Sequence, residues 1–475
     1  MVEKRISRRS FLALAGAGAA GVVLAACAPQ EVVVKEEVEV TREVEVEKEV
    51  QVEVEKEVPV EVTAAPEPMV LDMLWDNWGD FYNNLMTPIG ESYTQDVNPN
   101  VTVEWTFSPD WSQSLLTALA AGDAPDATFL RIHTCASLAY EQALLPLDAY
   151  MVQTGLEREQ FILAMYDPCV WEGKLYALPG GSDWNDLYYN KDLLEEVGIA
   201  APPTTVYELV EQSMQILETT PEGAIGRLGW SPSGGELRDY WGYIFGGSWY
   251  DERQRKITAD DPGVVAALQW MKDYVDELDV DQMTAFNESL PGFWSPGNSF
   301  ASNKTAFRID GFWTYEAMDE FAPDNSYGVV PIPTLQGKPE ETSNYSCVGW
   351  LVGIPSLSPR PDLAWDFLNY GWVENAWKMG CDTLNGPSVV AQLPQFQECM
   401  VEKLGTDNRI SEDFHVFVDH GAAATKSWPA FPANSLYADE VDRAYDFVIR
   451  GEKGVEEALQ EVNETVQKEL NKILG

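Results

Sequence analysis

Hydrophobic positions change their spacing in a regular way along the chain after residue 68. Segments 70–75, 101–107 and 127–130 are short, mostly apolar runs, which is typical of strands. Apolar residues at 84–96 recur three or four positions apart and predict a helix, and a second helical pattern ends at Gly122. Because such strands and helices alternate, the chain is predicted to be an α/β protein with mostly parallel sheets.

Three later helices carry start signals or a long apolar stripe. Thr205 and Glu208 form a capping box, in which each side chain accepts a hydrogen bond from the other residue's backbone N–H. Asp261 followed by Pro262 predicts another helix start. The stripe of the last helix consists of Val455, Leu459, Val462, Val466 and Leu470.

Residues 1–27 have the features of an export signal. Four basic residues precede an uncharged run at 11–26, which is shorter than the roughly 20 residues of a membrane-spanning helix. Arg8 and Arg9 give the segment the form of a twin-arginine signal, and an ordinary secretory signal with a chance Arg pair is the alternative. The run ends in Leu-Ala-Ala-Cys, which resembles a bacterial lipobox and predicts lipidation of Cys27. The chain is therefore expected outside the cell, anchored to the outer face of the membrane.

Residues 28–68 are of low complexity. Between residues 31 and 62 there are 12 Glu against 4 Lys or Arg, and Val alternates with Glu. Alternation is formally a strand pattern, but a lone strand has nothing against which to bury its Val face, and like charges favour extension. We therefore predict a solvated spacer, with a self-associating β-stalk as the alternative.

Charge and cysteine content limit the remaining chain, 69–475. The whole sequence carries a net charge of −46, which excludes nucleic acid as a partner and favours neutral or cationic ligands. With three His and no CxxC pair, neither a metal nor a cofactor is expected. Proximity in the sequence suggests the disulfides Cys135–Cys169 and Cys381–Cys399, which leaves Cys347 over.

Five phrases occur in a fixed order over about 250 residues. They are Ala-Ala-Gly-Asp-Ala-Pro-Asp at 120–126, Tyr-Ala-Leu-Pro with Tyr-Tyr-Asn-Lys-Asp-Leu at 176–193, Lys-Thr-Ala-Phe-Arg-Ile-Asp-Gly-Phe-Trp at 304–313, Gly-Val-Val-Pro-Ile-Pro with Gly-Trp-Leu-Val-Gly-Ile-Pro at 328–355, and Ala-Trp-Asp-Phe-Leu at 364–368. Together they resemble the family 1 extracellular solute-binding proteins, the carbohydrate-binding branch that includes maltose-binding protein. Phe307 departs from the Met that is usual in this family.

The resemblance implies a periplasmic-binding-protein type II fold, in which two α/β lobes are joined by three crossings and close on a ligand in the cleft between them. Lobe 1 would comprise about 69–186 and 342–383, lobe 2 about 187–341 and 384–475, and the crossings would lie near 181–187, 342–350 and 380–387.

A sugar ring needs aromatic faces for its apolar side and carboxylates or amides for its hydroxyls. Trp78 follows the first strand, Trp184 lies in the first predicted crossing, and Trp313 belongs to the Gly-x-Trp motif, so these three are the preferred stacking faces. Arg131 has a structural ion pair as its equal alternative, and His133 an ordinary surface or core position. The full set of candidate ligand-binding residues is Asn77, Trp78, Asp80, Arg131, His133, Trp184, Asn185, Trp230, Trp241, Asp310, Trp313, Trp350, Asn385 and Trp428.

The function that these observations predict is that of a monomeric, lipid-anchored binding protein. It would bind a sugar or oligosaccharide and deliver it to the permease of an ABC importer, whose ATPase is a separate chain because no GxxxxGK[ST] loop occurs here. The alternatives are a binding protein for a polyamine or another cationic solute, a secreted carbohydrate-active enzyme, and a surface adhesin. An enzyme is disfavoured because no nucleophile elbow or metal motif is present.

Overall fold

The computed structural model describes residues 68–338, 348–405 and 413–475. The predicted signal with Cys27, the spacer, and Cys347 therefore lie outside the described residues. Among the described residues, every helix is too short or too polar to span a bilayer.

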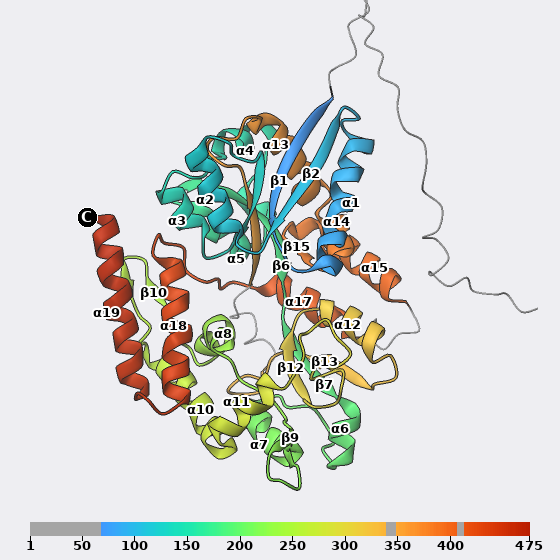
Figure 1. Cartoon of the computed structure of the whole chain (residues 1–475), viewed down its shortest axis with the longest axis vertical. Coiled ribbons are helices and arrows are strands. Elements are labelled where there is room, and N and C mark those ends of the chain that lie inside the picture. Colours follow the sequence, from blue (N-terminus) through green and yellow to red (C-terminus); the bar gives the residue numbers. More distant parts are fainter. Residues whose placement is uncertain (1–67, 339–347, 406–412) are drawn as a thin grey trace, which may run out of the picture. The chain divides into compact units, whose positions relative to one another are not determined.

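Lobe 1 is the part of the chain built on a six-stranded sheet, in the order β15-β6-β14-β3-β1-β2 (Figure 1). Its strands are β1 (Met69–Asp76), β2 (Val101–Ser108), β3 (Ala127–Arg131), β6 (Ala177–Asp183), β14 (Val348–Gly353) and β15 (Gly386–Pro387). Its helices are α1 (Asp80–Asp96), α2 (Trp111–Ala121), α3 (Cys135–Tyr140), α4 (Asp148–Thr154), α5 (Leu163–Tyr166), α13 (Pro361–Asn369), α14 (Ala376–Thr383) and α15 (Leu393–Leu404). Four short helical turns accompany them: η2 (Arg158–Gln160), η3 (Asp167–Cys169), η6 (Tyr370–Glu374) and η7 (Val390–Gln392). A small hairpin is formed by β4 (Val170–Trp171) and β5 (Lys174–Leu175).

Lobe 2 is the part built on a three-stranded antiparallel sheet, in the order β12-β7-β13. Its strands are β7 (Asp186–Asn190), β12 (Phe307–Asp310) and β13 (Tyr327–Val330), with the two-stranded pairs β8 (Glu218–Thr219) and β9 (Ile225–Arg227), and β10 (Tyr250–Asp251) and β11 (Lys256–Ile257). Its helices are α6 (Lys191–Glu196), α7 (Val206–Ile216), α8 (Gly234–Glu236), the π-helical turn η4 (Leu237–Trp241), α9 (Gly242–Ile244), α10 (Pro262–Leu278), α11 (Val280–Glu288), α12 (Trp313–Phe321), α17 (His415–Ala423), α18 (Asn434–Ile449) and α19 (Val455–Leu474).

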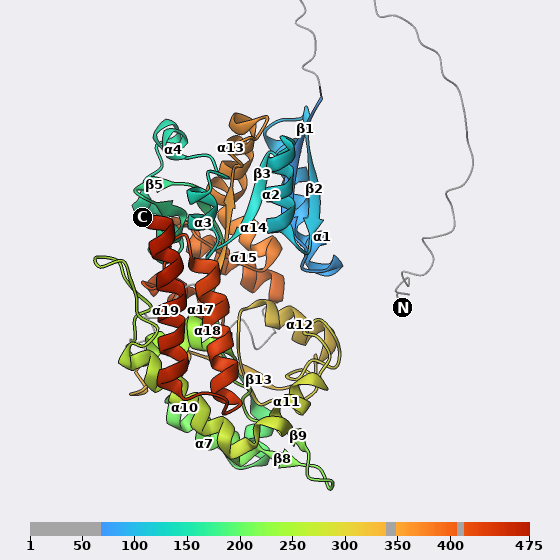
Figure 2. The same cartoon turned by 60° about the vertical axis from the view of Figure 1, so that its left-hand side comes forward.

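Three local features predicted from the sequence are confirmed: a helix end, a capping box and an apolar stripe. Helix α2 ends at Gly122, which adopts the left-handed conformation with φ 73°. The capping box at the start of α7 is formed. Thr205 Oγ1 accepts a 3.1 Å hydrogen bond from the backbone N–H of Glu208, and the Glu208 carboxylate accepts one from the backbone N–H of Thr205. All five residues of the last apolar stripe are buried along α19, which packs beside α18 (Figure 2).

The prediction of mostly parallel sheets is wrong. Strand β1 pairs in parallel with β2 and with β3, as expected for strands joined by α1 and α2. Every other pairing within the two main sheets is antiparallel. The reason is that β14 and β15 come from chain segments that return to lobe 1 from the opposite direction, a long-range event that local periodicity does not report.

The chain passes from lobe 1 to lobe 2 between β6 and β7, which are separated only by Trp184 and Asn185. The segment that returns the chain to β14 includes residues 339–347, outside the described residues. Gly386 and Pro387, which the predicted boundary placed in lobe 2, pair with β6 in the sheet of lobe 1.

The described cysteines divide into one disulfide and two thiols. Cys381 and Cys399 form a disulfide that joins α14 to α15, as predicted. Cys135 and Cys169 are free and buried, so the predicted bridge between them is not formed. Each sulfur instead lies near a backbone carbonyl, Cys135 Sγ at 3.8 Å from the oxygen of Cys169 and Cys169 Sγ at 3.3 Å from that of Met165.

Candidate ligand-binding site between the lobes

Three strands of lobe 1 end in a polar residue at the same edge of the sheet. Asp76, Arg131 and Asp183 are the last residues of β1, β3 and β6. Strands β1 and β3 are parallel, and β6 runs in the same direction because both β3 and β6 are antiparallel to β14. Lobe 2 adds Asp310, the last residue of β12, which pairs with Asp186 just beyond the crossing. We call this meeting point of the two lobes the junction. It corresponds to the edge where ligands bind in α/β folds.

Asp76 organises the lobe 1 side of the junction. Its Oδ2 lies 2.5 Å from a guanidinium nitrogen of Arg131 and accepts a 3.1 Å hydrogen bond from the indole N–H of Trp78. The Trp78 ring packs edge-on against Tyr82 and Phe129, with centroid distances of 5.0 and 5.2 Å, and remains half-buried. The Arg131 side chain stays 51% exposed. An indole ring and a guanidinium are thus held in fixed positions with surface left for a ligand.

Asp183 and Asn185 flank the first crossing. Burial raises the pKa of Asp183 to about 7, and the negative charge of Asp310 adds to the shift while Arg131 opposes it. The Asp183 Oδ1 and the Asn185 Oδ1 are buried atoms without a hydrogen-bond partner among the described residues. Asn185 uses its amide N–H to bond the hydroxyl of Tyr240 in lobe 2. The crossing therefore presents two acceptors that lack donors.

Glu236 occupies the lobe 2 side. Its Oε2 accepts from the indole N–H groups of Trp230 at 3.1 Å and Trp241 at 3.2 Å, while burial raises the pKa of its carboxyl to about 8. Nearby, Arg308 forms an ion pair with Asp310. Glu236, Arg308 and several hydroxyl side chains line a cavity of about 380 Å³ in lobe 2.

His133 sits in the loop after β3 and is half-buried. Burial lowers its pKa to about 4, and the positive charges of Arg238 and Arg131 contribute, so the imidazole is neutral at pH 7. Arg238 comes from lobe 2 and is itself paired with Asp239 at 3.0 Å and Asp442 at 2.9 Å. His133 is therefore a neutral group that follows the strand end at Arg131.

Trp313 opens helix α12 next to Asp310. Its ring lies so close over Gly311 that a Cβ atom there would come within 2.2 Å of it, and the side chain is only half-buried. Of the predicted residues, Trp78, Arg131, Asn185 and Asp310 lie at the junction, while His133 and Trp313 lie in the segments that directly follow β3 and β12.

Trp184, the preferred stacking face in the sequence, is not available to a ligand. It is fully buried, with its ring 6.1 Å from Phe312 and 5.8 Å from Phe396. Gly386 and Gly421 approach so closely that a Cβ atom at either would come within 2.5 Å of the ring. Its role is to fill the core at the crossing, which corrects the prediction.

Trp350 and Asn385 are also buried, at 3% and 2% exposure. The Trp350 indole N–H donates to Asn385 Oδ1 at 3.1 Å, and the Asn385 amide donates to Tyr82 Oη and, at 2.8 Å, to the Thr383 carbonyl. This closed network ties β14 to the segment before β15 and uses the polar groups that a ligand would need. Both predictions of ligand contact are corrected on this ground.

The remaining predicted tryptophans lie in the core of lobe 2. Trp230 stacks between Trp270 and Tyr274 at 5.2 and 5.4 Å, and Trp241 is fully buried. Trp428 is 5% exposed and borders a separate, wider opening of about 880 Å³.

Asn77 and Asp80 are exposed beside Trp78. The Asn77 Oδ1 stabilises a local turn, because it accepts hydrogen bonds from the Gly79 N–H at 3.0 Å and from the Asn83 amide at 2.9 Å. Asp80 is the first residue of α1. No hydrogen bond or ion pair with the described residues directs its side chain toward the junction.

Several residues of the junction were missed by the sequence reasoning. Asp76 could have been found, because it directly follows a predicted strand, and Asp183 lies within the predicted first crossing at 181–187 although it was not chosen as a ligand-binding residue. Glu236 and Tyr240 carry no comparable signal, since only the tertiary fold brings them to the crossing, whereas Arg308 lies two residues before Asp310 in the same family phrase.

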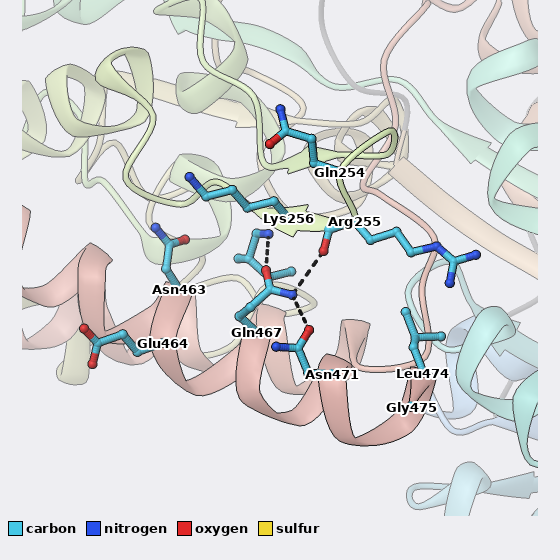
Figure 3. Close-up of a pocket in the computed structure, with 10 residues that line it drawn as sticks. Gln254, Arg255, Lys256, Asn463, Glu464, Gln467, Asn471, Leu474 and Gly475 are labelled. Atoms are coloured by element: carbon cyan, nitrogen blue, oxygen red, sulfur yellow. Dashed lines mark hydrogen bonds between the residues drawn. The ribbon is translucent and has the colours of Figure 1, made fainter.

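A second groove, of about 680 Å³, lies between the β10–β11 hairpin and α19 (Figure 3). Here the amide of Gln467 accepts from the Ile257 N–H at 2.9 Å and donates to the Arg255 carbonyl and to Asn471. These bonds hold the hairpin on the helix, and the described residues that line the groove include no aromatic side chain. Among the residues described, no group of three or more His, Cys, Asp or Glu is arranged to hold a metal ion.

The chain is similar in sequence to one protein family and to several known binding proteins. The family described as bacterial extracellular solute-binding protein matches residues 75–371. A protein of Brucella abortus (strain 2308), named as a binding protein, is 28% identical over 277 residues, which are 58% of this chain and 65% of that relative. The maltodextrin-binding protein MdxE of Bacillus subtilis (strain 168) is 27% identical over 278 residues, 57% of this chain and 62% of that protein. The chain thus spans less than two thirds of the length of these relatives.

Solved structures extend the likeness to nearly the whole described region. A mannobiose-bound protein, CpMnBP1, aligns with a TM-score of 0.70 at 22% identity, over 84% of this chain and all of that chain. A solute-binding protein of an ABC transporter from Thermotoga lettingae, bound with α-D-tagatose, aligns with a TM-score of 0.67 at 22% identity, over 86% of this chain and all of that chain. These likenesses confirm the predicted type II fold of two α/β lobes.

Proposed function

The chain belongs to the bacterial extracellular solute-binding proteins, and from that membership we propose that it binds a sugar or oligosaccharide at the junction of its two lobes. Members of this family are binding proteins and not enzymes.

The observation that carries the proposal is the combination of half-buried indole rings and fixed polar groups contributed by both lobes. Trp78 and Trp313 offer the apolar faces that a pyranose ring requires, one from each lobe. Arg131, Asp183 and Asn185 provide a donor and two unsatisfied acceptors for hydroxyl groups. The sugar ligands named in the similar structures agree with this chemistry.

Closure of the lobes would enclose the solute. Because the indole rings lie on different lobes, a solute that touches both is held fully only when the lobes approach each other. The closed form is the one that we propose docks on the permease of an ABC importer and releases its solute there. Anchoring through a lipidated Cys27, with residues 28–68 as a spacer, would keep the domain close to that permease.

A thermal-shift screen of the purified protein tests the function. We expect mono- and oligosaccharides of one class to raise the melting temperature, because a ligand at 100 times its dissociation constant adds about 2.7 kcal/mol to the free energy of unfolding. The bound sugar should be recovered chemically unchanged. The absence of any shift across sugars, polyols and amines, or consumption of the sugar, would contradict the proposal.

A further inference from the structure

Asp183 differs from the other carboxylates of the junction in its hydrogen bonds. Asp76 accepts from Arg131 and Trp78. Asp310 accepts from Arg308 and, at 2.9 Å, from the Gly311 N–H, and Glu236 accepts from two indoles. The Asp183 Oδ1, in contrast, is buried and has no donor among the described residues.

Among the described residues, neither arginine of the junction donates a hydrogen bond to Asp183. Arg131, whose charge acts on Asp183, pairs with Asp76, and Arg308 pairs with Asp310. A buried carboxylate oxygen without a donor is costly, and the charge of Asp310 raises the cost of the ionised form by repulsion. The site therefore lacks one positive charge that carries hydrogen-bond donors.

We propose that the solute is an amino sugar whose protonated amine binds to Asp183. This inference rests on the proposed function and specifies the class of sugar. An ammonium group supplies three donors and a positive charge, so it can bond to the Asp183 Oδ1 and keep donors for a second acceptor; the Asn185 Oδ1, two residues along the chain, also lacks a donor. A neutral hydroxyl supplies one donor and leaves the charge of Asp183 uncompensated.

The aromatic residues of the site suit the same group. The half-buried rings of Trp78 and Trp313 can stack on the sugar ring, and indole faces also attract cations. The net charge of −46 would in addition draw a cationic solute toward the protein.

Binding of the amine should depend on pH with a definite sign. The groups that act on Asp183 are Asp310 and Tyr240 from lobe 2, with Arg131 and Tyr82 from lobe 1. Since the pKa of Asp183 is raised to about 7 in the empty site, part of the Asp183 population is protonated below that pH. An ammonium favours the ionised form, so affinity for the amine should increase between about pH 5.5 and pH 7.5.

The test compares matched solutes by isothermal titration calorimetry on the full chain. Glucosamine, N-acetylglucosamine and glucose form one set, and galactosamine, N-acetylgalactosamine and galactose a second, with putrescine as a linear amine. We expect the amino form of one set to bind at least about tenfold more tightly than its acetylated and neutral partners at pH 7.5. Equal or weaker binding of the amine, with clear binding of the neutral sugar, would overturn the inference and leave the proposed function standing.

Two variants sharpen the result. Asp183→Asn removes the charge with little change of shape and should abolish the preference for the amine. Glu211→Gln removes an exposed carboxylate on α7, a helix that contributes no residue to the junction, and should keep the preference. Retention of the preference in Asp183→Asn would contradict the assignment.

If Asp183→Asn fails to fold, the pH series on the unchanged protein decides, because constant affinity between about pH 5.5 and pH 7.5 would overturn the inference. Binding of putrescine alone, with no sugar, would contradict both the inference and the proposed function.

Discussion

The core at the crossing and the junction beside it use the same kind of side chain in different ways. At the crossing, Trp184 and Trp350 are almost fully buried and are surrounded by aromatic rings and close glycines. At the junction, Trp78 and Trp313 are half-buried and stand beside charged groups. The comparison shows that the role of a tryptophan in this fold is decided by how completely neighbouring segments cover it.

The largest expected effect is on stability, at the crossing. Trp184→Ala should lower the free energy of unfolding by about 3–5 kcal/mol, because it leaves a cavity where two lobes share one core. Urea denaturation followed by circular dichroism measures it. Unchanged stability with loss of solute binding would mean that Trp184 contacts the solute after all, and would break the distinction between the two regions.

Asn385→Ala should have the next largest effect. It leaves the indole N–H of Trp350 without its acceptor and breaks the bond to Tyr82, which should cost about 1–3 kcal/mol of stability. Asn84→Ala, an exposed site on α1, is the matched control and should stay within about 0.5 kcal/mol of the unchanged protein. Similar denaturation midpoints for the two variants would contradict the structural role of Asn385.

Trp313→Ala should mainly affect binding. Loss of one stacking face should weaken sugar affinity about tenfold, and because the ring is only half-buried, stability should fall by less than half of the amount lost in Trp184→Ala. Calorimetric titration and urea denaturation of the same preparation separate the two quantities. A variant that binds as tightly as the unchanged protein would remove Trp313 from the site.

The last prediction is of another kind and concerns the pH dependence of stability on the lobe 2 side. Burial raises the pKa of Glu236 from 4.5 to about 8, so the native state favours the protonated form, and the contribution of Glu236 to stability decreases as the pH rises toward 8. Glu236→Gln mimics the protonated form. Its stability relative to the unchanged protein should therefore increase between about pH 5 and pH 8.5, measured by urea denaturation at several pH values. A difference that stays constant over this range would contradict the raised pKa.

The sequence predicted those parts of the fold that depend on local patterns. The strands around Trp75 and Phe129, the box at Thr205 and the stripe along α19 follow from the spacing of neighbouring residues, and the family phrases indicated two lobes. The antiparallel pairing of β14 did not follow, because it depends on the route by which the chain returns from lobe 2.

The candidate site was predictable only in part, for the same reason. Trp78 and Asp310, which lie at the junction, were named as candidates because they follow strands or belong to a family phrase. The burial of Trp184 depends on Gly386 and Gly421, more than 200 residues away in the sequence, and no local pattern reports their approach. Likewise, the lack of a donor for Asp183 becomes visible only once Arg131 is seen to be paired with Asp76.

The most direct test of the account is a crystal structure of the protein with the solute that gives the largest thermal shift. We predict that the solute lies at the junction, with ring faces against Trp78 and Trp313 and a polar group on Asp183, and that Trp184 remains covered beneath it. A solute bound in the groove between the β10–β11 hairpin and α19, or one that contacts only one lobe, would contradict the account.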